Sequence, residues 1–409
     1  MEYTQEKPGY TMTTVMEEAA RCLLCHDAPC SQACPAETDP ARFIRSVRFR
    51  NFKGAAETIR ENNVLGAICA RVCPTERYCE LACTRSDIDV PIDIGGIQRF
   101  VTDFEQQTKM DILKKKTANG KKVAIVGSGP AGLQAATTLL QEGYTVDVYE
   151  KQEKAGGYLT YGIPEYRLPT EIVRYEIKRI ENLGANFHYK QSIGTDLSLE
   201  DVKKTHDAVI LAIGASEGKM LPMFKENPAV ETAVSFLART RENHGDVPLP
   251  KSALVIGGGD VAMDVNATLK ILGVEHVTDV VYEEFAEFKA SEQELALAQQ
   301  HGVTIVDGYV PESVSENTVT FTGRNVSSKM SITAEKIYLA VGQKVNAQGL
   351  PLPIEKNEVT FSGYQTEDPK VFVAGDIAKG DKTVVWAVQK GKEAAYAVDQ
   401  LLGGKENDR

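Results

Sequence analysis

The sequence has no cysteine after residue 83, although eight cysteines lie before that point. Disulfides are rare where the compartment keeps thiols reduced, and a chain of 409 residues can bury hydrophobic cores without them. All eight thiols lie in the first fifth of the chain, and this indicates that they serve one local site rather than a disulfide framework.

The sequence also lacks a basic excess and a long apolar run. It has 46 Lys and Arg against 57 Asp and Glu, a formal charge of -11 that is spread along the chain. Its longest apolar runs, such as VILAIGA, are too short to span a bilayer, and its N-terminus has no basic start and no apolar signal segment. These absences argue against nucleic-acid and membrane partners and predict a cytoplasmic protein.

The chain changes character near residue 117. Residues 1–117 place apolar side chains three and four apart and predict helices, with no convincing strand. After the polar stretch TANGKK, apolar runs alternate with helical patterns, as in a parallel sheet, and the alternation restarts at SALVIGGGD. The predicted fold class is α + α/β: a helical domain at 1–117, a split nucleotide-binding domain at 118–230 and 345–409, and a second one inserted at 231–344.

The cysteines form two motifs, C-x2-C-x4-C-x3-C-P from Cys22 to Pro35 and C-x3-C-x5-C-x3-C from Cys69 to Cys83. Thiolates at this density are soft ligands for zinc or iron–sulfur clusters. Structural zinc usually shows two short C-x2-C pairs, whereas three cysteines and then a fourth followed by proline resemble a ferredoxin arrangement. The spacing favours iron–sulfur over zinc. The six histidines show no metal-ligand pairing.

Two glycine-rich loops each follow a predicted strand and open a predicted helix. The first carries Gly127, Gly129 and Gly132, and Glu150 ends the following strand, where a carboxylate can accept hydrogen bonds from a ribose. The second carries Gly257, Gly259 and Ala262. Together the loops predict two dinucleotide sites, one for a bound flavin and one for an exchanging nicotinamide; the plainer alternative for the second is an α/β unit with a glycine turn.

The strand after the second loop ends in Tyr282, Glu283 and Glu284. An acidic strand end repels the 2′-phosphate of NADPH and suits the free hydroxyl of NADH. Near the C-terminus, Asp376 follows a last strand and could bind the ribityl chain of a flavin, and a helix beginning near Thr383 would point its N-terminal dipole at the flavin ring. Alternatively, Asp376 only caps that helix.

Taken together, these motifs resemble those of the flavin subunit of bacterial NAD-dependent dihydropyrimidine dehydrogenases, and the resemblance extends over nearly the whole chain. The resemblance rests on stretches such as RCLLCHDAPCSQACP, GAICARVCPT, YGIPEYRLP and AGDIAKGDKTVVWAV. It implies two 4Fe–4S clusters, FAD and NAD(H). It implies one cluster on Cys22, Cys25, Cys30 and Cys83, and the other on Cys34, Cys73, Cys79 and Gln98, which leaves Cys69 without a metal. The loop with Gly157 and Arg167 is expected to frame the flavin.

The function that the resemblance implies is electron input. The chain would oxidise NADH at FAD and relay electrons through the two clusters to a separate FMN- and iron–sulfur-containing subunit, which reduces uracil or thymine. No catalytic acid or nucleophile is expected, because the cofactors supply the chemistry. Alternatives are a glutamate synthase small subunit, another NAD(P)H:acceptor oxidoreductase, and a zinc-stapled or redox-sensing scaffold without turnover. Glutamate synthase subunits typically have VCPAPC in the second motif, which this chain lacks.

Overall fold

The structure is a computed structural model that describes residues 9–403 apart from 351, 353, 356–357 and 360. Contacts divide the chain into two compact units. The larger unit holds the described residues of 4–160, 166–214 and 345–409, and the smaller unit holds 161–165 and 215–344. No helix in the described part of the chain is both long and apolar enough to cross a membrane.

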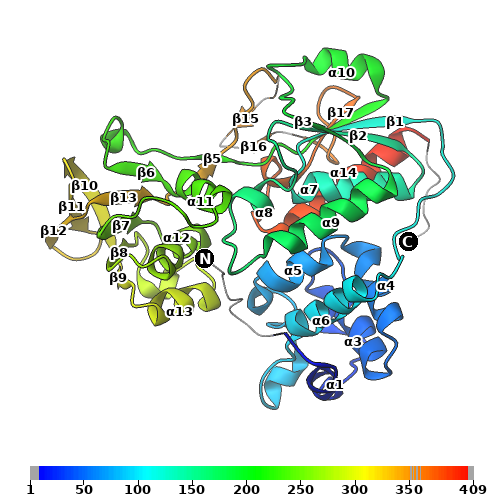
Figure 1. Ribbon diagram of the computed structural model, residues 1–409, viewed down its shortest axis with the longest axis horizontal. Helices are drawn as coiled ribbons and strands as arrows, with labels where there is room; N and C mark the ends of the chain where they lie inside the picture. The colour runs from blue at the N-terminus through cyan, green and yellow to red at the C-terminus, as the bar shows by residue number, and fades with distance from the viewer. Residues whose placement is uncertain (1–8, 351, 353, 356–357, 360, 404–409) are drawn as a thin grey trace. The chain divides into compact units, whose positions relative to one another are not determined.

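The first part of the larger unit is helical, as predicted (Figure 1). Side chains of Thr11, Asp39, Asn51 and Asp93 accept hydrogen bonds from backbone N–H groups of the first helical turns and so fix where four helices begin. The apolar faces of these helices share one core. The elements are α1 (Met12–Ala20), α2 (Pro29–Gln32), α3 (Pro40–Arg48), α4 (Phe52–Asn62), α5 (Gly66–Val72), η1 (Thr75–Arg77), η2 (Thr84–Asp87) and α6 (Ile94–Gln107).

A five-stranded parallel sheet follows, with the strand order β17-β4-β1-β2-β3. Its strands are β1 (Lys122–Val126), β2 (Thr145–Glu150), β3 (Asn186–Tyr189), β4 (Ala208–Leu211) and β17 (Val371–Val373). The accompanying helices are α7 (Pro130–Gln141), α8 (Tyr158–Tyr161), α9 (Thr170–Leu183), α10 (Leu199–Thr205), η5 (Gly375–Ile377) and α14 (Val384–Leu401), and a short hairpin pairs β15 (Ile354–Glu355) with β16 (Glu358–Val359). Because β17 returns from the C-terminal part of the chain, this sheet is discontinuous in sequence.

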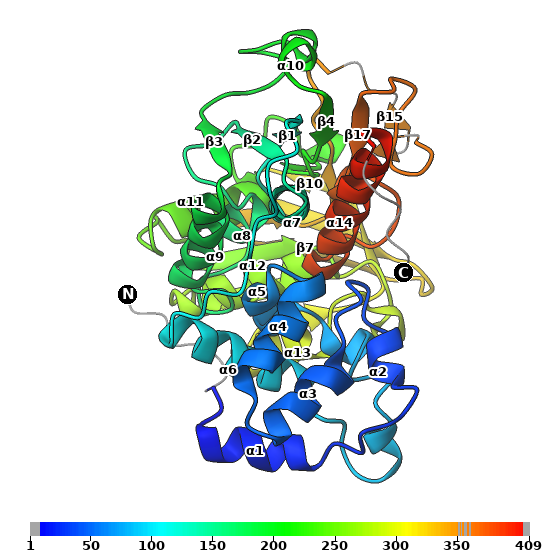
Figure 2. The ribbon, with the colours of Figure 1, turned by 90° about the vertical axis from the view of Figure 1, so that its right-hand side faces the viewer.

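Helix α14 lies along α7 (Figure 2). A Cβ added to Gly391 of α14 would lie 2.2 Å from the carbonyl oxygen of Ala131 in α7, so glycine is required for this close approach. The C-terminal helix is therefore tied to the helix that follows the first glycine-rich loop.

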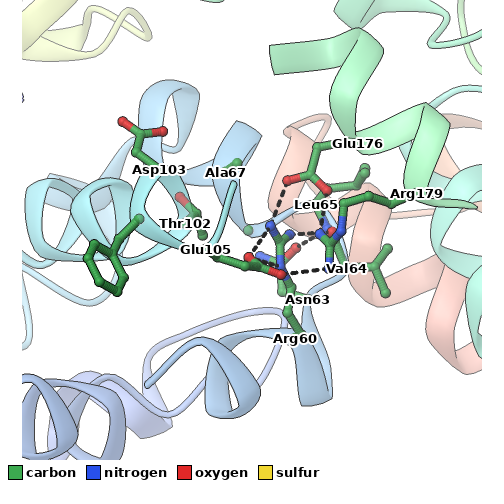
Figure 3. A network of polar contacts seen from close by, with 12 residues as sticks. Arg60, Asn63, Val64, Leu65, Ala67, Thr102, Asp103, Glu105, Glu176 and Arg179 are labelled. Atoms are coloured by element: carbon green, nitrogen blue, oxygen red, sulfur yellow. Dashed lines mark hydrogen bonds and ion pairs between the residues drawn. The ribbon is translucent and has the colours of Figure 1, made fainter. Parts of the chain in front are cut away.

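A buried ion cluster joins the helical part to this sheet domain within the larger unit (Figure 3). Arg60 of α4 donates from Nη2 to Glu105 of α6 and to Glu176 of α9, each at 2.8 Å, and all three side chains are at most 1% exposed. Arg179 of α9 adds a 2.7 Å contact to Glu105. Burial opposes the charge on Arg60, but Glu176 and Glu105 outweigh it and raise the pKa of the guanidinium.

The smaller unit contains a second five-stranded parallel sheet, in the order β6-β13-β7-β8-β9. Its strands are β6 (Val230–Thr232), β7 (Ser252–Ile256), β8 (His276–Val280), β9 (Thr304–Val306) and β13 (Lys336–Leu339), with η3 (Pro222–Phe224), α11 (Ala233–Glu242), α12 (Asp260–Ile271), η4 (Phe285–Glu287) and α13 (Glu292–Gln300). The helical domain and two parallel sheets confirm the predicted fold class. The sequence did not predict the antiparallel sheet of β10 (Tyr309–Ser315), β11 (Thr318–Gly323) and β12 (Lys329–Thr333), or the β5 (Glu217–Gly218) and β14 (Gln343–Lys344) pair.

One carboxyl group in β8, that of Asp279, is buried with a single hydrogen-bond partner among the described residues. Asp279 is fully buried; its Oδ2 accepts a 2.7 Å hydrogen bond from Asn266, and its Oδ1 has no partner among the described residues. Burial raises the pKa of Asp279 well above 3.8, and Asn266 offsets this only in part. The protonated carboxyl stabilises the fold fully below its unfolded pKa, and this contribution falls as pH rises toward the folded pKa.

Asp279→Asn is therefore expected to stabilise the smaller unit more at pH 8 than at pH 5, because the neutral amide carries no ionisation cost. Thermal unfolding of both proteins at the two pH values measures the difference. An equal difference at both pH values would contradict a protonated Asp279.

Candidate functional site

Four cysteines from two distant segments line one cavity in the helical part. Cys22 and Cys25 come from the chain between α1 and α2, Cys30 lies in α2, and Cys83 immediately precedes η2. Apolar side chains, including Ala28, Ile44 and Ile92, complete the lining. Burial, together with the nearby thiols of Cys22 and Cys83, raises the pKa of the Cys30 thiol to about 11. The four cysteines of the first predicted ligand set are thus brought together.

In the other predicted set, Cys73 is the C-cap of α5, and Cys34 and Cys79 lie close enough to influence its thiol. Burial raises the pKa of Cys73 and Cys79 well above the usual thiol value, with further contributions from Cys34 to both. Gln98 lies on α6, where it is buried, and its Nε2 donates a 2.8 Å hydrogen bond to the carbonyl of Gly66. This bond leaves the amide oxygen as the atom that could bind a metal.

The donor set fits an iron–sulfur cluster better than a single metal ion. Among the described residues, no three His, Cys, Asp or Glu side chains are close enough to share one ion. A 4Fe–4S cluster separates its four thiolates more widely than a tetrahedral zinc site does, so gathered but spaced cysteines fit the cluster. Cys69, one helical turn before Cys73, is buried and also lies close enough to raise the pKa of the Cys73 thiol, so its exclusion from the ligand set stays a prediction.

The first glycine-rich loop connects β1 to α7. Gly127 has φ +102°, and a Cβ there would lie 2.4 Å from the carbonyl oxygen of Ala212; a Cβ on Gly132 would lie 2.0 Å from the carbonyl oxygen of Gly127. Glycine is therefore required at both positions. Gly129 precedes α7, whose first backbone N–H groups have no side-chain cap. Glu150, buried at the end of β2, accepts hydrogen bonds from Ser128 N at 3.1 Å and Gln152 N at 2.8 Å.

The remaining predicted flavin residues lie near this loop or at the start of α14. A Cβ on Gly157 would lie 3.0 Å from Cα of Gly129, which places the two loops in contact. Arg167 lies half-buried between α8 and α9. Asp376 lies in η5; burial raises its pKa, while Lys382 and Lys390 act against this rise. Thr383 is the N-cap of α14.

The second glycine-rich loop connects β7 to α12 in the smaller unit. A Cβ on Gly257 would lie 2.4 Å from the carbonyl oxygen of Ala340, Gly259 is the N-cap of α12, and Ala262 is fully buried. The two loops can be aligned by one shared hydrogen bond: Gly257 N donates to Val280 O in the smaller unit, and Gly127 N donates to Tyr149 O in the larger unit. Val281 therefore takes the position that Glu150 has in the larger unit. Glu283 follows two residues later, a shift that the sequence pattern did not reveal.

Two family models match the chain, one on each side of the predicted boundary near residue 117. Residues 1–110 match the family described as dihydropyrimidine dehydrogenase domain II, 4Fe–4S cluster, and residues 121–391 match the pyridine nucleotide-disulphide oxidoreductase family. These matches confirm the predicted cofactor classes, iron–sulfur, FAD and NAD(H). The individual ligand and cofactor residues stay predictions.

Curated relatives resemble the chain over its length. The NAD-dependent dihydropyrimidine dehydrogenase subunit PreT of Escherichia coli O157:H7 is 55% identical over 398 residues, which cover 97% of this chain and 96% of that protein. PreT of Salmonella typhimurium LT2 is 55% identical over 396 residues, with the same shares covered. The glutamate synthase [NADPH] small chain of Escherichia coli K12 is 29% identical over 432 residues, covering 94% and 91%.

Solved structures share the fold of the nucleotide-binding part. FprA of Mycobacterium tuberculosis in complex with NADPH has a TM-score of 0.60 at 17% identity, covering 69% of this chain and 84% of that chain. Thioredoxin reductase of Lactococcus lactis has a TM-score of 0.54 at 21% identity, covering 69% and 99%. From the sequence relatives and the two matched families, the chain belongs to the family of NAD-dependent dihydropyrimidine dehydrogenase subunits, which are oxidoreductases.

Proposed function

We propose that the chain is the electron-input subunit of an NADH-dependent dihydropyrimidine dehydrogenase. It would oxidise NADH and deliver the electrons, by way of FAD and two 4Fe–4S clusters, to an FMN- and iron–sulfur-containing subunit that reduces uracil or thymine. FAD supplies the chemistry that joins a two-electron hydride donor to one-electron carriers. The residues that would hold each group are those of the two cysteine sets and the two glycine-rich loops, in the domains at 1–117, 118–230 with 345–409, and 231–344.

The observation that carries this proposal is the contact between the second cysteine set and the helix predicted to face the flavin. Tyr78, which precedes Cys79, donates a 3.1 Å hydrogen bond to Asp381, two residues before the N-cap of α14. Lys392, fully buried on α14, donates at 3.0 Å to the carbonyl of Ala36, two residues after Cys34. These contacts would hold a cluster close to a flavin, and short separation is what fast electron transfer requires.

An apolar surface around the first cysteine set supports a protein partner on that side. Ile88 and Val90 are 63% and 62% exposed, beside Cys83 in sequence. Arg21 donates to the carbonyl of Val90 at 2.6 Å, and Arg48 donates to the carbonyl of Cys22 at 3.3 Å, so these segments adjoin. Phe49, next to Arg48, is 73% exposed. Exposed apolar side chains beside a redox site suit a subunit that receives electrons there.

Arg45, Arg48 and Arg50 are also exposed, and none forms an ion pair within the part of the chain that the structure describes. The partner surface is therefore expected to be apolar with an acidic rim.

Ile88→Asp is expected to weaken binding of the partner subunit by at least about tenfold, because it places a charge in an apolar contact. Affinity is measured by titrating the partner onto the purified chain, with NADH-dependent flavin reduction as the folding check. Val326→Asp is the matched control, since Val326 is exposed in the smaller unit. Equal weakening by both variants would place the partner elsewhere.

The function itself is tested by coexpression with the candidate partner. We expect NADH-dependent reduction of uracil only when both subunits are present, and NADH oxidation with an artificial acceptor by this chain alone. A chain that supports glutamate formation with a glutamate synthase large subunit, but not uracil reduction, would favour the alternative assignment.

A further inference from the structure

We propose that coenzyme choice rests on carboxylates that mask two cations: Glu283 holds Lys289 and Glu287 holds Arg324, so that neither cation is available for the 2′-phosphate of NADPH. The inference rests on the proposed use of NADH at the second glycine-rich loop. It adds Lys289, Glu287 and Arg324 as specificity-determining residues and predicts a latent site for a phosphate monoester.

Glu283 lies directly at the glycine-rich loop. A Cβ added to Gly258 would be 3.1 Å from its Oε2, so the carboxylate reaches the turn between β7 and α12. This is the region where the adenosine ribose lies in dinucleotide-binding folds. The Glu283 side chain is only 16% exposed, and its other oxygen is 2.6 Å from Nζ of Lys289. A carboxylate can accept hydrogen bonds from two ribose hydroxyls, whereas a phosphate in the same place would meet its negative charge.

Lys289 is held by this carboxylate but extends into solvent, with its side chain 74% exposed. Without the charge on Glu283, this ammonium would no longer be neutralised by that carboxylate, and its charge would favour a phosphate bound nearby. The pair therefore acts in two ways, because Glu283 repels a 2′-phosphate and also occupies the cation nearest to it.

The second pair, Arg324 with Glu287, contacts Tyr282, the residue before Glu283. Arg324, in the chain after β11, stacks on the ring of Tyr282 with its guanidinium carbon 4.3 Å from the ring centre. Its Nη1 donates to the carbonyl of Tyr282 at 3.1 Å and to Glu287 at 3.0 Å. A guanidinium stacked on an aromatic ring at a strand end is suited to bind a phosphate, but here Glu287 occupies it.

The local charge balance supports masking. Three carboxylates, on Glu283, Glu284 and Glu287, face two cations, on Lys289 and Arg324, and Asp307 adds a fourth carboxylate that accepts a 2.9 Å hydrogen bond from Phe285 N. The fold does not decide the coenzyme, because FprA in complex with NADPH has the same fold. A few charged side chains at one strand end are thus sufficient to determine the choice.

The test measures binding of ADP-ribose and 2′-phospho-ADP-ribose to the holoprotein by calorimetry. Glu283→Gln is expected to tighten 2′-phospho-ADP-ribose by about tenfold or more, since it removes repulsion and frees one charge-assisted hydrogen bond. Glu283→Gln combined with Lys289→Met is expected to lose most of this gain. Glu312→Gln is the matched control, because Glu312 forms a 2.6 Å ion pair with Lys329 on the separate antiparallel sheet.

Unchanged affinity for 2′-phospho-ADP-ribose in Glu283→Gln, or a gain that survives loss of Lys289, would overturn the masking proposal while leaving the proposed function intact. Failure of the wild-type protein to bind ADP-ribose or to accept electrons from NADH would instead overturn the NADH site, and the masking proposal with it. Rapid reduction of the flavin by NADPH in Glu283→Gln, but not in the wild type, gives an independent kinetic readout.

Discussion

Arg60→Met is expected to destabilise the larger unit by about 3–5 kcal/mol, because it leaves two buried carboxylates with only Arg179 to balance their charge. Glu105 and Glu176 are both at most 1% exposed and each contacts Arg60 at 2.8 Å (Figure 3). Arg179 contacts both carboxylates but cannot replace the hydrogen bonds that Arg60 makes. The measurement is denaturant unfolding of the anaerobic holoprotein.

Arg42→Met is the matched control for this prediction. Arg42 forms a 2.8 Å ion pair with Glu61, but both side chains are more than half exposed, so its loss is expected to cost about 0–1 kcal/mol. Adding either Glu105→Gln or Glu176→Gln to Arg60→Met should recover much of the lost stability, because the remaining carboxylate then balances the charge of Arg179. Equal costs for Arg42→Met and Arg60→Met would show that the buried cluster does not hold the two parts together.

Cys79→Ala is expected to remove one whole cluster and lower the iron content from about eight to about four atoms per chain. Cys79 is buried and Cys73 half-buried, both thiols are influenced by Cys34, and a 4Fe–4S cluster that loses one of its ligands is usually not retained. Iron and sulfide analysis of anaerobically purified protein measures the loss, and the spectrum of the other cluster should remain.

Cys69→Ala distinguishes a ligand from a buried neighbour. Cys69 is buried one helical turn before Cys73 and lies close enough to influence its thiol. The Cys69→Ala protein is expected to keep about eight iron atoms per chain. Loss of iron in Cys69→Ala together with retention in Cys79→Ala would reverse the ligand assignment for the second set.

The sequence predicted the helical domain and both parallel sheets well, because these depend on local patterns. Glycine spacing after an apolar run predicted the turns at Gly127 and Gly257, where the structure leaves no room for a side chain. Apolar residues spaced three and four apart predicted the helices that carry the cysteines. The two glycine-rich loops and both cysteine segments were therefore visible without coordinates.

The contacts between distant segments could not be predicted in this way. Nothing near Arg60 in sequence indicates Glu176, 116 positions away, and nothing near Lys392 indicates the carbonyl of Ala36. The two-residue offset of Glu283 from the position of Glu150 also appears only when the registers of the two sheets are compared. Contacts of this kind depend on how helices and strands pack against each other in the folded chain. A local sequence pattern predicts only the single helix or strand in which it occurs.

The central claim is that NADH electrons reach iron–sulfur clusters within this one chain. Anaerobic purification, with iron, sulfide and flavin quantified, followed by an NADH titration monitored by electron paramagnetic resonance, tests it most directly. We expect about eight iron atoms and one FAD per chain, with signals of reduced clusters growing as NADH is added. Zinc or empty thiols in an anaerobically reconstituted sample, or clusters that NADH does not reduce, would contradict it.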